Sequence, residues 1–295
     1  MSSRENNNKG AAKNAAPKRE GIFDHAVFNL HHDLDAGEEL FRSLGFNITP
    51  RGYHSLGSMN NLIVFGTDYL ELVGLDPDNP KPRKELLDWP IGLNGLVYGS
   101  DEIESTRTRL LEKQLPVLEA KAFSRPVTVA GETVEARFRT ANMGPGYFPA
   151  SRLYFCEHQT PELVWHDSFM IHANTAFRID GIAIASETPE IDARRLADVL
   201  DAVPSAEAEV TAGGVRIDFG SLQEQTGALE NAADEPLPRA VAIRIGVRSL
   251  GALKASLDPV WTNSVIESDG KRLIVPPARC FGVAIEFIEQ QERLA

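Results

Sequence analysis

The sequence has little of what several large classes of protein depend on. Its two cysteines, Cys156 and Cys280, are too few for a disulfide framework and fit a reducing cytoplasm. Thirty Lys and Arg against 42 Asp and Glu give a net charge of −12, which argues against a nucleic-acid surface because phosphate binding needs clustered cations. No apolar run approaches the roughly 18 residues of a membrane span, and the N-terminus lacks the apolar core of a signal peptide. We therefore expect a cytoplasmic protein that binds neither nucleic acid nor membrane.

Familiar catalytic motifs are missing as well. The chain has no Gly-rich nucleotide loop of standard form, no Gly-x-Ser-x-Gly elbow and no Cys-x-x-Cys pair. What remains is ordinary for a globular protein, with 42% hydrophobic and 24% charged residues. A length of 295 residues allows one large domain or two of ordinary size.

Residues 21–74 set the pattern that the rest of the chain repeats. The segment 23–30, FDHAVFNL, is rich in aromatic and β-branched side chains and predicts a strand. An amphipathic helix follows, with Asp33 or Asp35 as its cap and Gly45 just beyond its end. Two short strands complete the unit. The helix is expected to reach about Ser43, and the strands to span 61–65 and 69–73.

Three further units of the same kind are predicted, which makes four at a period of roughly 60 to 80 residues. One strand–helix–strands unit leaves a face of its curved sheet uncovered, so two units must pair to close a cup. We therefore predict an α+β protein of four βαβββ units forming two paired domains. The predicted boundaries are 1–21 for a disordered tail, 22–166 for the first domain and 167–295 for the second, more degenerate one.

This pattern resembles the vicinal-oxygen-chelate superfamily, and more narrowly its glyoxalase-like proteins, a group that also includes bleomycin-resistance proteins and extradiol dioxygenases. The resemblance is strong over 21–74, continues in part to about residue 178, and beyond that is one of architecture only. Two departures are Ser58 in place of the usual Thr and Thr175 in place of the usual Gly. The matching motifs are Asp24-His25, DLDA at 33–36, LGF at 44–46, RGYHSLGSMN at 51–60, YLE at 69–71, TPELVW at 160–165 and HANTA at 172–176.

The resemblance implies a divalent metal at the mouth of a cup, held by His and Glu from the first and last strands of two units, where it chelates two neighbouring substrate oxygens. His25 and Glu71 occupy these positions in the first unit. Imidazole nitrogen and carboxylate oxygen suit Zn²⁺, Fe²⁺, Mn²⁺ or Ni²⁺. An inward-facing Glu is costly unless it is paired or bound to a metal. The alternative is a buried hydrogen bond between His25 and Glu71 with no ion.

The second unit departs from the ligand pattern. Alignment of its first strand places Gly95 where a ligand is expected, and alignment of its last strand places Tyr154 or Phe155 there. His158, at the end of that strand, is the best candidate for a third ligand, which gives the set His25, Glu71 and His158 with positions open for substrate. If the first unit pairs with the fourth instead, Glu286 joins His25 and Glu71.

Candidate catalytic residues lie near the same positions. His54 stands in a Gly- and Asn-containing turn and is either a general base or anion-binding group, or a surface histidine. Asn60 can orient a substrate by one hydrogen bond, and Glu71 can act as a base. His172 is either a cover for the first cup or an anchor between domains.

Two functions remain open at this point. One is an enzyme acting on a small oxygen-rich or aromatic metabolite by metal-assisted lyase, isomerase or ring-cleaving dioxygenase chemistry. The other is a metal-free binding protein of the antibiotic-sequestering type, which Gly95 favours. A homodimer is possible in either case, because such units pair between chains as well as within them.

Overall fold

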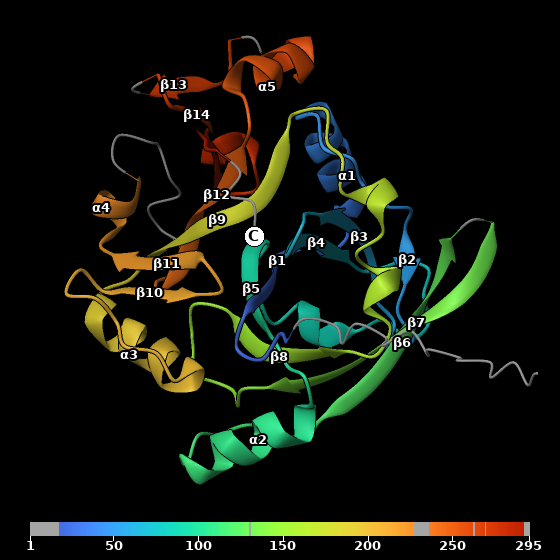
Figure 1. The fold of residues 1–295 in the computed structure, drawn as a ribbon, viewed down its shortest axis with the longest axis vertical. Helices are drawn as coiled ribbons and strands as arrows, with labels where there is room; N and C mark the ends of the chain where they lie inside the picture. The colour runs from blue at the N-terminus through green and yellow to red at the C-terminus, as the bar shows by residue number, and fades with distance from the viewer. Residues whose placement is uncertain (1–17, 130, 227–235, 262, 269, 292–295) are drawn as a thin grey trace, which may run out of the picture.

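A computed structural model of the protein describes residues 18–129, 131–226, 236–261, 263–268 and 270–291. Two curved β-sheets, with helices packed against them, make up the molecule (Figure 1). This confirms the α+β class expected from the sequence. Most of the expected N-terminal tail, 1–17, lies outside the described residues.

The first sheet has eight strands in the order β2-β3-β4-β1-β5-β8-β7-β6. Its strands are β1 (Phe23–Asn29), β2 (Gly52–Tyr53), β3 (Met59–Val64), β4 (Tyr69–Gly74), β5 (Gly92–Gly99), β6 (Lys121–Val129), β7 (Glu132–Asn142) and β8 (Arg152–His158). Its helices are α1 (Leu34–Ser43) and α2 (Ile103–Glu112). Asp33 flanks α1 as expected, although its side chain makes no capping hydrogen bond.

The strand order shows which units pair. β1 runs antiparallel to β5, while β1 is parallel to β4 and β5 is parallel to β8. The first and second units are therefore joined edge to edge through β1 and β5, about a local pseudo-two-fold axis. The alternative pairing of the first unit with the fourth is wrong, and Glu286 belongs to the other sheet.

The second sheet has seven described strands in the order β10-β11-β9-β12-β15-β14-β13. Among the described residues, the third unit has two strands after its first helix rather than the expected three, followed by the short helix α4. The strands are β9 (Ala176–Ala185), β10 (Glu209–Ala212), β11 (Val215–Gly220), β12 (Arg239–Val247), β13 (Ile266–Ser268), β14 (Arg272–Val275) and β15 (Ala284–Glu289). The helices are α3 (Pro189–Leu200), α4 (Leu222–Thr226) and α5 (Leu250–Ser256).

One continuous core joins the helix-facing sides of both sheets. Phe41 of α1 and Phe287 of β15 belong to the same buried cluster, and the ring of Phe46 stacks on that of Phe287 with centroids 5.8 Å apart. The concave faces hold two separate clusters; we call these faces the first and second cups. None of the described helices has both the length and the apolar character that a bilayer crossing requires.

Candidate functional site

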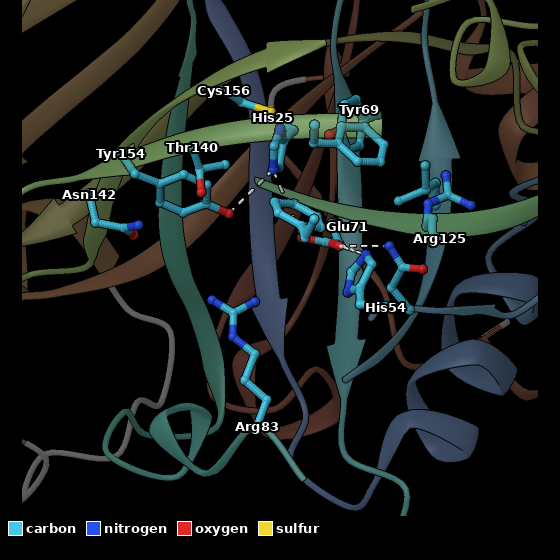
Figure 2. Close-up of a pocket in the computed structure, with 14 residues that line it drawn as sticks. His25, His54, Tyr69, Glu71, Arg83, Arg125, Thr140, Asn142, Tyr154 and Cys156 are labelled. Atoms are coloured by element: carbon cyan, nitrogen blue, oxygen red, sulfur yellow. Dashed lines mark hydrogen bonds and ion pairs between the residues drawn. The ribbon is translucent and has the colours of Figure 1, made fainter. Parts of the chain in front are cut away.

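A small polar cavity lies in the first cup, between strands of both units (Figure 2). Its volume is about 40 Å³, enough for an ion or a few water molecules. It lies beside a larger hollow of about 270 Å³, with which it shares Leu62 and Arg125. The residues lining the cavity are His25, His54, Asn60, Leu62, Tyr69, Glu71, Arg83, Phe123, Arg125, Phe138, Thr140, Asn142, Tyr154 and Cys156.

One extra residue in β1 brings two neighbouring polar side chains together. Along β5, Phe23 pairs with Tyr98 and His25 pairs with Val97, which leaves Asp24 as a β-bulge. At the bulge, consecutive side chains no longer point to opposite faces of the sheet. As a result, Oδ1 of Asp24 lies 2.6 Å from Nδ1 of His25.

This contact fixes which nitrogen of the His25 ring carries a hydrogen toward Asp24. A carboxylate only accepts hydrogen bonds, so Nδ1 donates to Asp24, and in the neutral ring Nε2 has a free lone pair. Nε2 lies 3.9 Å from Oε2 of Glu71 and 3.4 Å from the hydroxyl of Tyr154. Carboxylate partners orient metal-binding histidines in the same way.

Asp24 is fully buried and yet ionised. Burial favours the neutral acid, but the charges and hydrogen bonds of His158 and His25 outweigh it and hold the pKa of Asp24 well below its usual value. Its second oxygen, Oδ2, accepts a hydrogen bond from Nη2 of Arg19 at 3.0 Å. Arg19 was expected in the disordered tail, and the predicted range 1–21 therefore extends too far.

Glu71 enters the cavity from β4, while its neighbours Leu70 and Leu72 face the core as the alternation of the strand predicts. Asn60 donates a hydrogen bond from Nδ2 to Oε1 of Glu71 at 2.7 Å. Burial alone would raise the pKa of Glu71, but the charges of His54 and His25 and the Asn60 bond together lower it. Glu71 is consequently a carboxylate at neutral pH.

His54 lies between β2 and β3 and is not the surface residue of the alternative interpretation, since its side chain is only 6% exposed. Nε2 is 3.8 Å from Oε1 of Glu71, and Nδ1 is 2.9 Å from Oγ of Ser58. Burial lowers the pKa of His54 to about 4, opposed by Glu71 and assisted by Arg125 and Arg83. The ring is therefore neutral at pH 7.

The pseudo-two-fold axis shows what stands opposite His25 and Glu71. Val27 pairs with Gly95 across β1 and β5, which makes Gly95 the counterpart of His25, as the sequence alignment predicted. The parallel ladders then make Tyr154 the counterpart of Glu71. The second unit thus contributes a phenol to the cavity and no imidazole or carboxylate.

His158 does not join His25 and Glu71, so the predicted three-ligand set is not assembled. It lies four residues beyond Tyr154 on β8, roughly 13 Å along the strand. Its Nε2 is instead 3.0 Å from Oδ1 of Asp24. Within the part of the chain that the structure describes, the three ligand atoms of His25, Glu71 and His158 do not come within 4.8 Å of one another.

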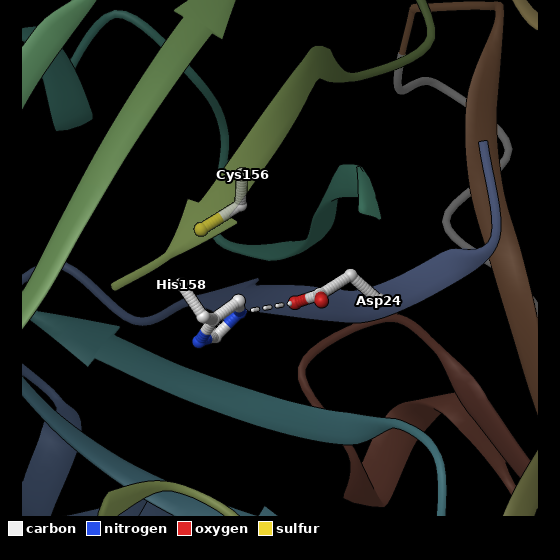
Figure 3. Close-up of side chains that lie close together, drawn as sticks. All are labelled: Asp24, Cys156 and His158. Atoms are coloured by element: carbon white, nitrogen blue, oxygen red, sulfur yellow. Dashed lines mark hydrogen bonds and ion pairs between the residues drawn. The ribbon is translucent and has the colours of Figure 1, made fainter. Parts of the chain in front are cut away.

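Asp24, Cys156 and His158 do place three potential metal ligands within 4.8 Å of one another (Figure 3). However, both oxygens of Asp24 are already occupied by Arg19, His25 and His158. Burial also raises the pKa of the Cys156 thiol well above its usual value, so the sulfur keeps its proton. Asp24 is thus the centre of a hydrogen-bond network, while Nδ1 of His158 is buried without a hydrogen-bond partner among the described residues.

Two arginines, Arg83 and Arg125, also line the cavity (Figure 2), and sequence reasoning missed both. Arg83 comes from the Pro-rich connector after β4, and its Nε bonds Glu85 at 2.9 Å. Arg125 is in β6 and is 5% exposed. A buried arginine in a short strand carries no local sequence signal, because only the tertiary structure shows which element covers it.

In the second cup, the two carboxylates at the positions of Glu71 pair with an arginine. Register places Glu286 on β15 beside Arg244 on β12, and Asp218 on β11 beside Ala183 on β9, so both acids stand where Glu71 stands in the first cup. The guanidinium of Arg244 bonds Asp218 and, at 3.3 Å, Glu286. A side-chain cation thus satisfies both acids.

His172 is an anchor between the two sheets and not a cover for the cavity. Nδ1 accepts a hydrogen bond from the backbone N–H of Asn47 at 3.0 Å, and Nε2 donates to the carbonyl of Val64 at 2.9 Å. Burial lowers its pKa to about 4, which keeps the ring in the neutral form that these two bonds need.

Comparison with known proteins agrees with this architecture. The family profile described as a glyoxalase-like domain matches residues 23–200. No curated protein matches the chain. Among solved structures, a hypothetical protein from Staphylococcus aureus is 12% identical with a TM-score of 0.63, over 91% of this chain and 99% of that one.

Two further structures are similar at lower scores. A triple mutant of 4-hydroxymandelate synthase from Streptomyces coelicolor is 15% identical with a TM-score of 0.54, over 95% of each chain. A fusion of a xylose isomerase-like TIM barrel with 4-hydroxyphenylpyruvate dioxygenase is 13% identical with a TM-score of 0.55, over 95% of this chain but 50% of that one. At these identities the likeness is one of fold.

Proposed function

Because the chain belongs to the glyoxalase-like domain family, we propose that its first cup is the active site of an enzyme that transforms a small, oxygen-rich metabolite with the help of a divalent metal. One observation carries the proposal. Nε2 of His25 and Oε2 of the Glu71 carboxylate lie 3.9 Å apart in a buried cavity, and Nε2 is the ring nitrogen that the Asp24 contact leaves for a ligand. An imidazole nitrogen and a carboxylate oxygen at this spacing are a donor pair that suits a divalent cation.

The donors fit such an ion reasonably well. Ligands about 2.1 Å from a metal lie roughly 3 to 3.5 Å apart, so the two ligand atoms, 3.9 Å apart, must approach each other by about 0.4 to 0.9 Å. His25 and Glu71 would hold the ion, and Asp24 would keep the His25 ring in the binding tautomer. The ion would supply Lewis-acid polarisation of two neighbouring substrate oxygens.

The remaining residues favour proton transfer, which is the chemistry of an isomerase or lyase. His54 is neutral at pH 7 and can accept or deliver a proton at Nε2. Asn60 holds the Glu71 carboxylate in place. A non-haem iron oxygenase uses two histidines and one carboxylate on one face of the metal, and among the described residues His25, His54 and Glu71 do not converge to that extent. Ring-cleaving dioxygenase chemistry is therefore the less favoured assignment.

Elemental analysis of protein purified without chelator tests the proposal. We expect about one divalent ion per chain in the wild type, lost in His25→Ala and in Glu71→Ala because each removes one of two protein ligands. His32→Ala, which changes an exposed histidine in the turn between β1 and α1, is the matched control and should keep the ion.

Two results would contradict the proposal. A wild type without bound metal, and without uptake of Zn²⁺, Fe²⁺, Mn²⁺ or Ni²⁺ in a titration, excludes the metal-assisted enzyme and leaves a metal-free binding cup or an acid–base site. Loss of the ion in Cys156→Ser and His158→Ala, but not in Glu71→Ala, would assign it to the Asp24 group instead.

A further inference from the structure

We propose that the substrate of this cavity is a carboxylate that carries a hydroxyl or enol group next to it. Arg125 binds the carboxylate, and Oδ1 of Asn60 accepts a hydrogen bond from the hydroxyl or enol group. The inference rests on the proposed function only in taking this cavity as the active site. It depends on two neighbouring groups in the cavity wall that have no hydrogen-bond partner among the described residues. The guanidinium of Arg125 is a donor, and Oδ1 of Asn60 is an acceptor.

Arg125 is a buried cation without a counterion. Only 5% of the residue is exposed, and among the described residues no carboxylate or carbonyl forms an ion pair or hydrogen bond with its guanidinium. Elsewhere in the fold, buried arginines have such partners, as Arg244 does with Asp218 and Glu286. A buried charge without a partner is costly. An anion that enters the cavity would remove that cost, and guanidinium binds planar carboxylates in a two-pronged manner.

Asn60 supplies the matching acceptor. Its amide nitrogen is committed to the Glu71 carboxylate at 2.7 Å, which also fixes the orientation of the amide, because a carboxylate accepts and does not donate. The carbonyl oxygen Oδ1 is then left buried with no hydrogen-bond partner. This oxygen requires a donor, which a second carboxylate cannot provide but a hydroxyl or enol can.

Gly52 brings the two groups together. A Cβ at this position would lie 2.6 Å from Oδ1 of Asn60 and 3.1 Å from Nη1 of Arg125. Glycine is therefore required here, because both groups pack closely against its Cα, and this packing places them near each other in the cavity wall. A carboxylate with an adjacent hydroxyl group presents its acceptor and its donor at this short spacing.

The charges of the cavity agree with an anionic ligand. Glu71 is the one carboxylate among the lining residues, against the cations of Arg83 and Arg125. Arg125 also borders the hollow of about 270 Å³, whose wall includes the apolar side chains of Pro50, Val127 and Phe169. The body of a larger acid can extend into that hollow while its carboxylate stays on Arg125.

Thermal unfolding of the full chain with small probes tests the inference. Lactate is the probe, because it has the carboxylate and the adjacent hydroxyl. Acetate lacks the hydroxyl, lactamide lacks the charge, and sodium chloride at equal ionic strength controls for salt. At ten times its Kd, lactate should raise the wild-type melting temperature by about 2 °C. Acetate should act more weakly, and lactamide and chloride should have no effect.

Arg125→Met removes the guanidinium and keeps an unbranched side chain of similar reach. We expect it to lose the lactate shift, while its own melting temperature is no lower than that of the wild type, because an unpaired buried charge has gone. Arg42→Met, at an exposed arginine of α1, is the matched control and should keep the shift. An equal response to lactate and chloride, or a lactate shift that survives in Arg125→Met, would overturn the inference.

His25→Ala separates this inference from the proposed function. It keeps Arg125, Asn60 and the Glu71 carboxylate that orients Asn60, so lactate should still stabilise it although metal binding is lost. If the wild type binds lactate but no metal, the proposed function is contradicted and this inference is kept. If it binds metal but does not respond to lactate, this inference is contradicted and the proposed function is kept.

Discussion

At the scale of single residues, Asp24 orients the His25 ring in the site although it does not itself line the cavity. Its carboxylate holds His25, His158 and Arg19 at once. The sequence contains it in a recognisable Asp-His motif, yet strict alternation would place Asp24 and His25 on opposite faces of the strand. The bulge that overrides alternation depends on pairing with β5, which a single segment does not reveal.

Asp24→Asn should lower the free energy of unfolding by about 3 kcal/mol, because it leaves the partly buried guanidinium of Arg19 without its anion and removes the charged acceptor that His25 and His158 share. The pKa of Asp24 is lowered by folding, so its contribution is complete above the unfolded pKa of about 4 and is lost as the pH falls through the folded pKa. Urea unfolding at pH 7 and pH 3.5 should therefore show a smaller difference between the proteins at the lower pH.

Asp35→Asn provides the matched control for Asp24→Asn. Asp35 pairs with Arg51 at 2.5 Å, but its side chain is 88% exposed, and exposed pairs contribute little. We expect a change of less than about 0.5 kcal/mol. Equal losses in the two variants would mean that Asp24 is not the centre of a buried network.

At the scale of elements, the β1–β5 seam explains why the second unit supplies no histidine. A Cβ at Gly95 would lie 2.5 Å from Cβ of Val27, so the seam has no room for a side chain there. The sequence alignment identified both Gly95 and Tyr154 as counterparts of the ligand positions. It did not exclude His158, because the length of β8 beyond Tyr154 is set by its pairing with β7 and not by any residue of β8 itself.

Gly95→Ala should destabilise the protein by about 2 kcal/mol through overpacking against Val27. Val27→Gly should be destabilising by itself, because it removes a buried side chain and frees the backbone. In the double variant the Cβ and Cγ2 of Val27, which the new methyl group would meet at 2.5 and 2.7 Å, are absent, so the two losses should sum to at least about 1 kcal/mol more than the measured loss. Strictly additive losses in a double-mutant cycle would contradict the close approach of the two strands.

At the scale of the whole molecule, repetition was the strongest sequence signal, since four strand–helix segments at similar spacing predicted two paired sheets. The described part of the third unit has two strands after its helix and not three, which was not predicted, because an apolar β-branched run signals a strand without stating how many neighbours it will have. The division of the chain at residues 166 and 167 remains a prediction. Just beyond it, His172 ties the segment before β9 to the first half of the chain through Val64 and Asn47.

The wild type should lose stability as the pH falls from 6.5 towards 4, in part through His172. Its pKa is lowered by burial to about 4, so the unfolded chain takes up the proton first, and folding is weakened by about 2 kcal/mol between pH 7 and pH 5. His172→Gln should show a smaller loss over this range in urea unfolding. His32→Gln, at an exposed site, should behave as the wild type does, and an unchanged loss in His172→Gln would contradict the assignment.

The Arg244 bridge makes the second cup independent of metal ions in the solution. In the second cup the positive charge between two acids is a guanidinium, present in every copy of the chain and protonated at any ordinary pH. A chelating agent can withdraw an ion from solution but has nothing to withdraw from this bridge. A change in melting temperature on adding chelator would therefore originate in the first cup and not in the Arg244 bridge.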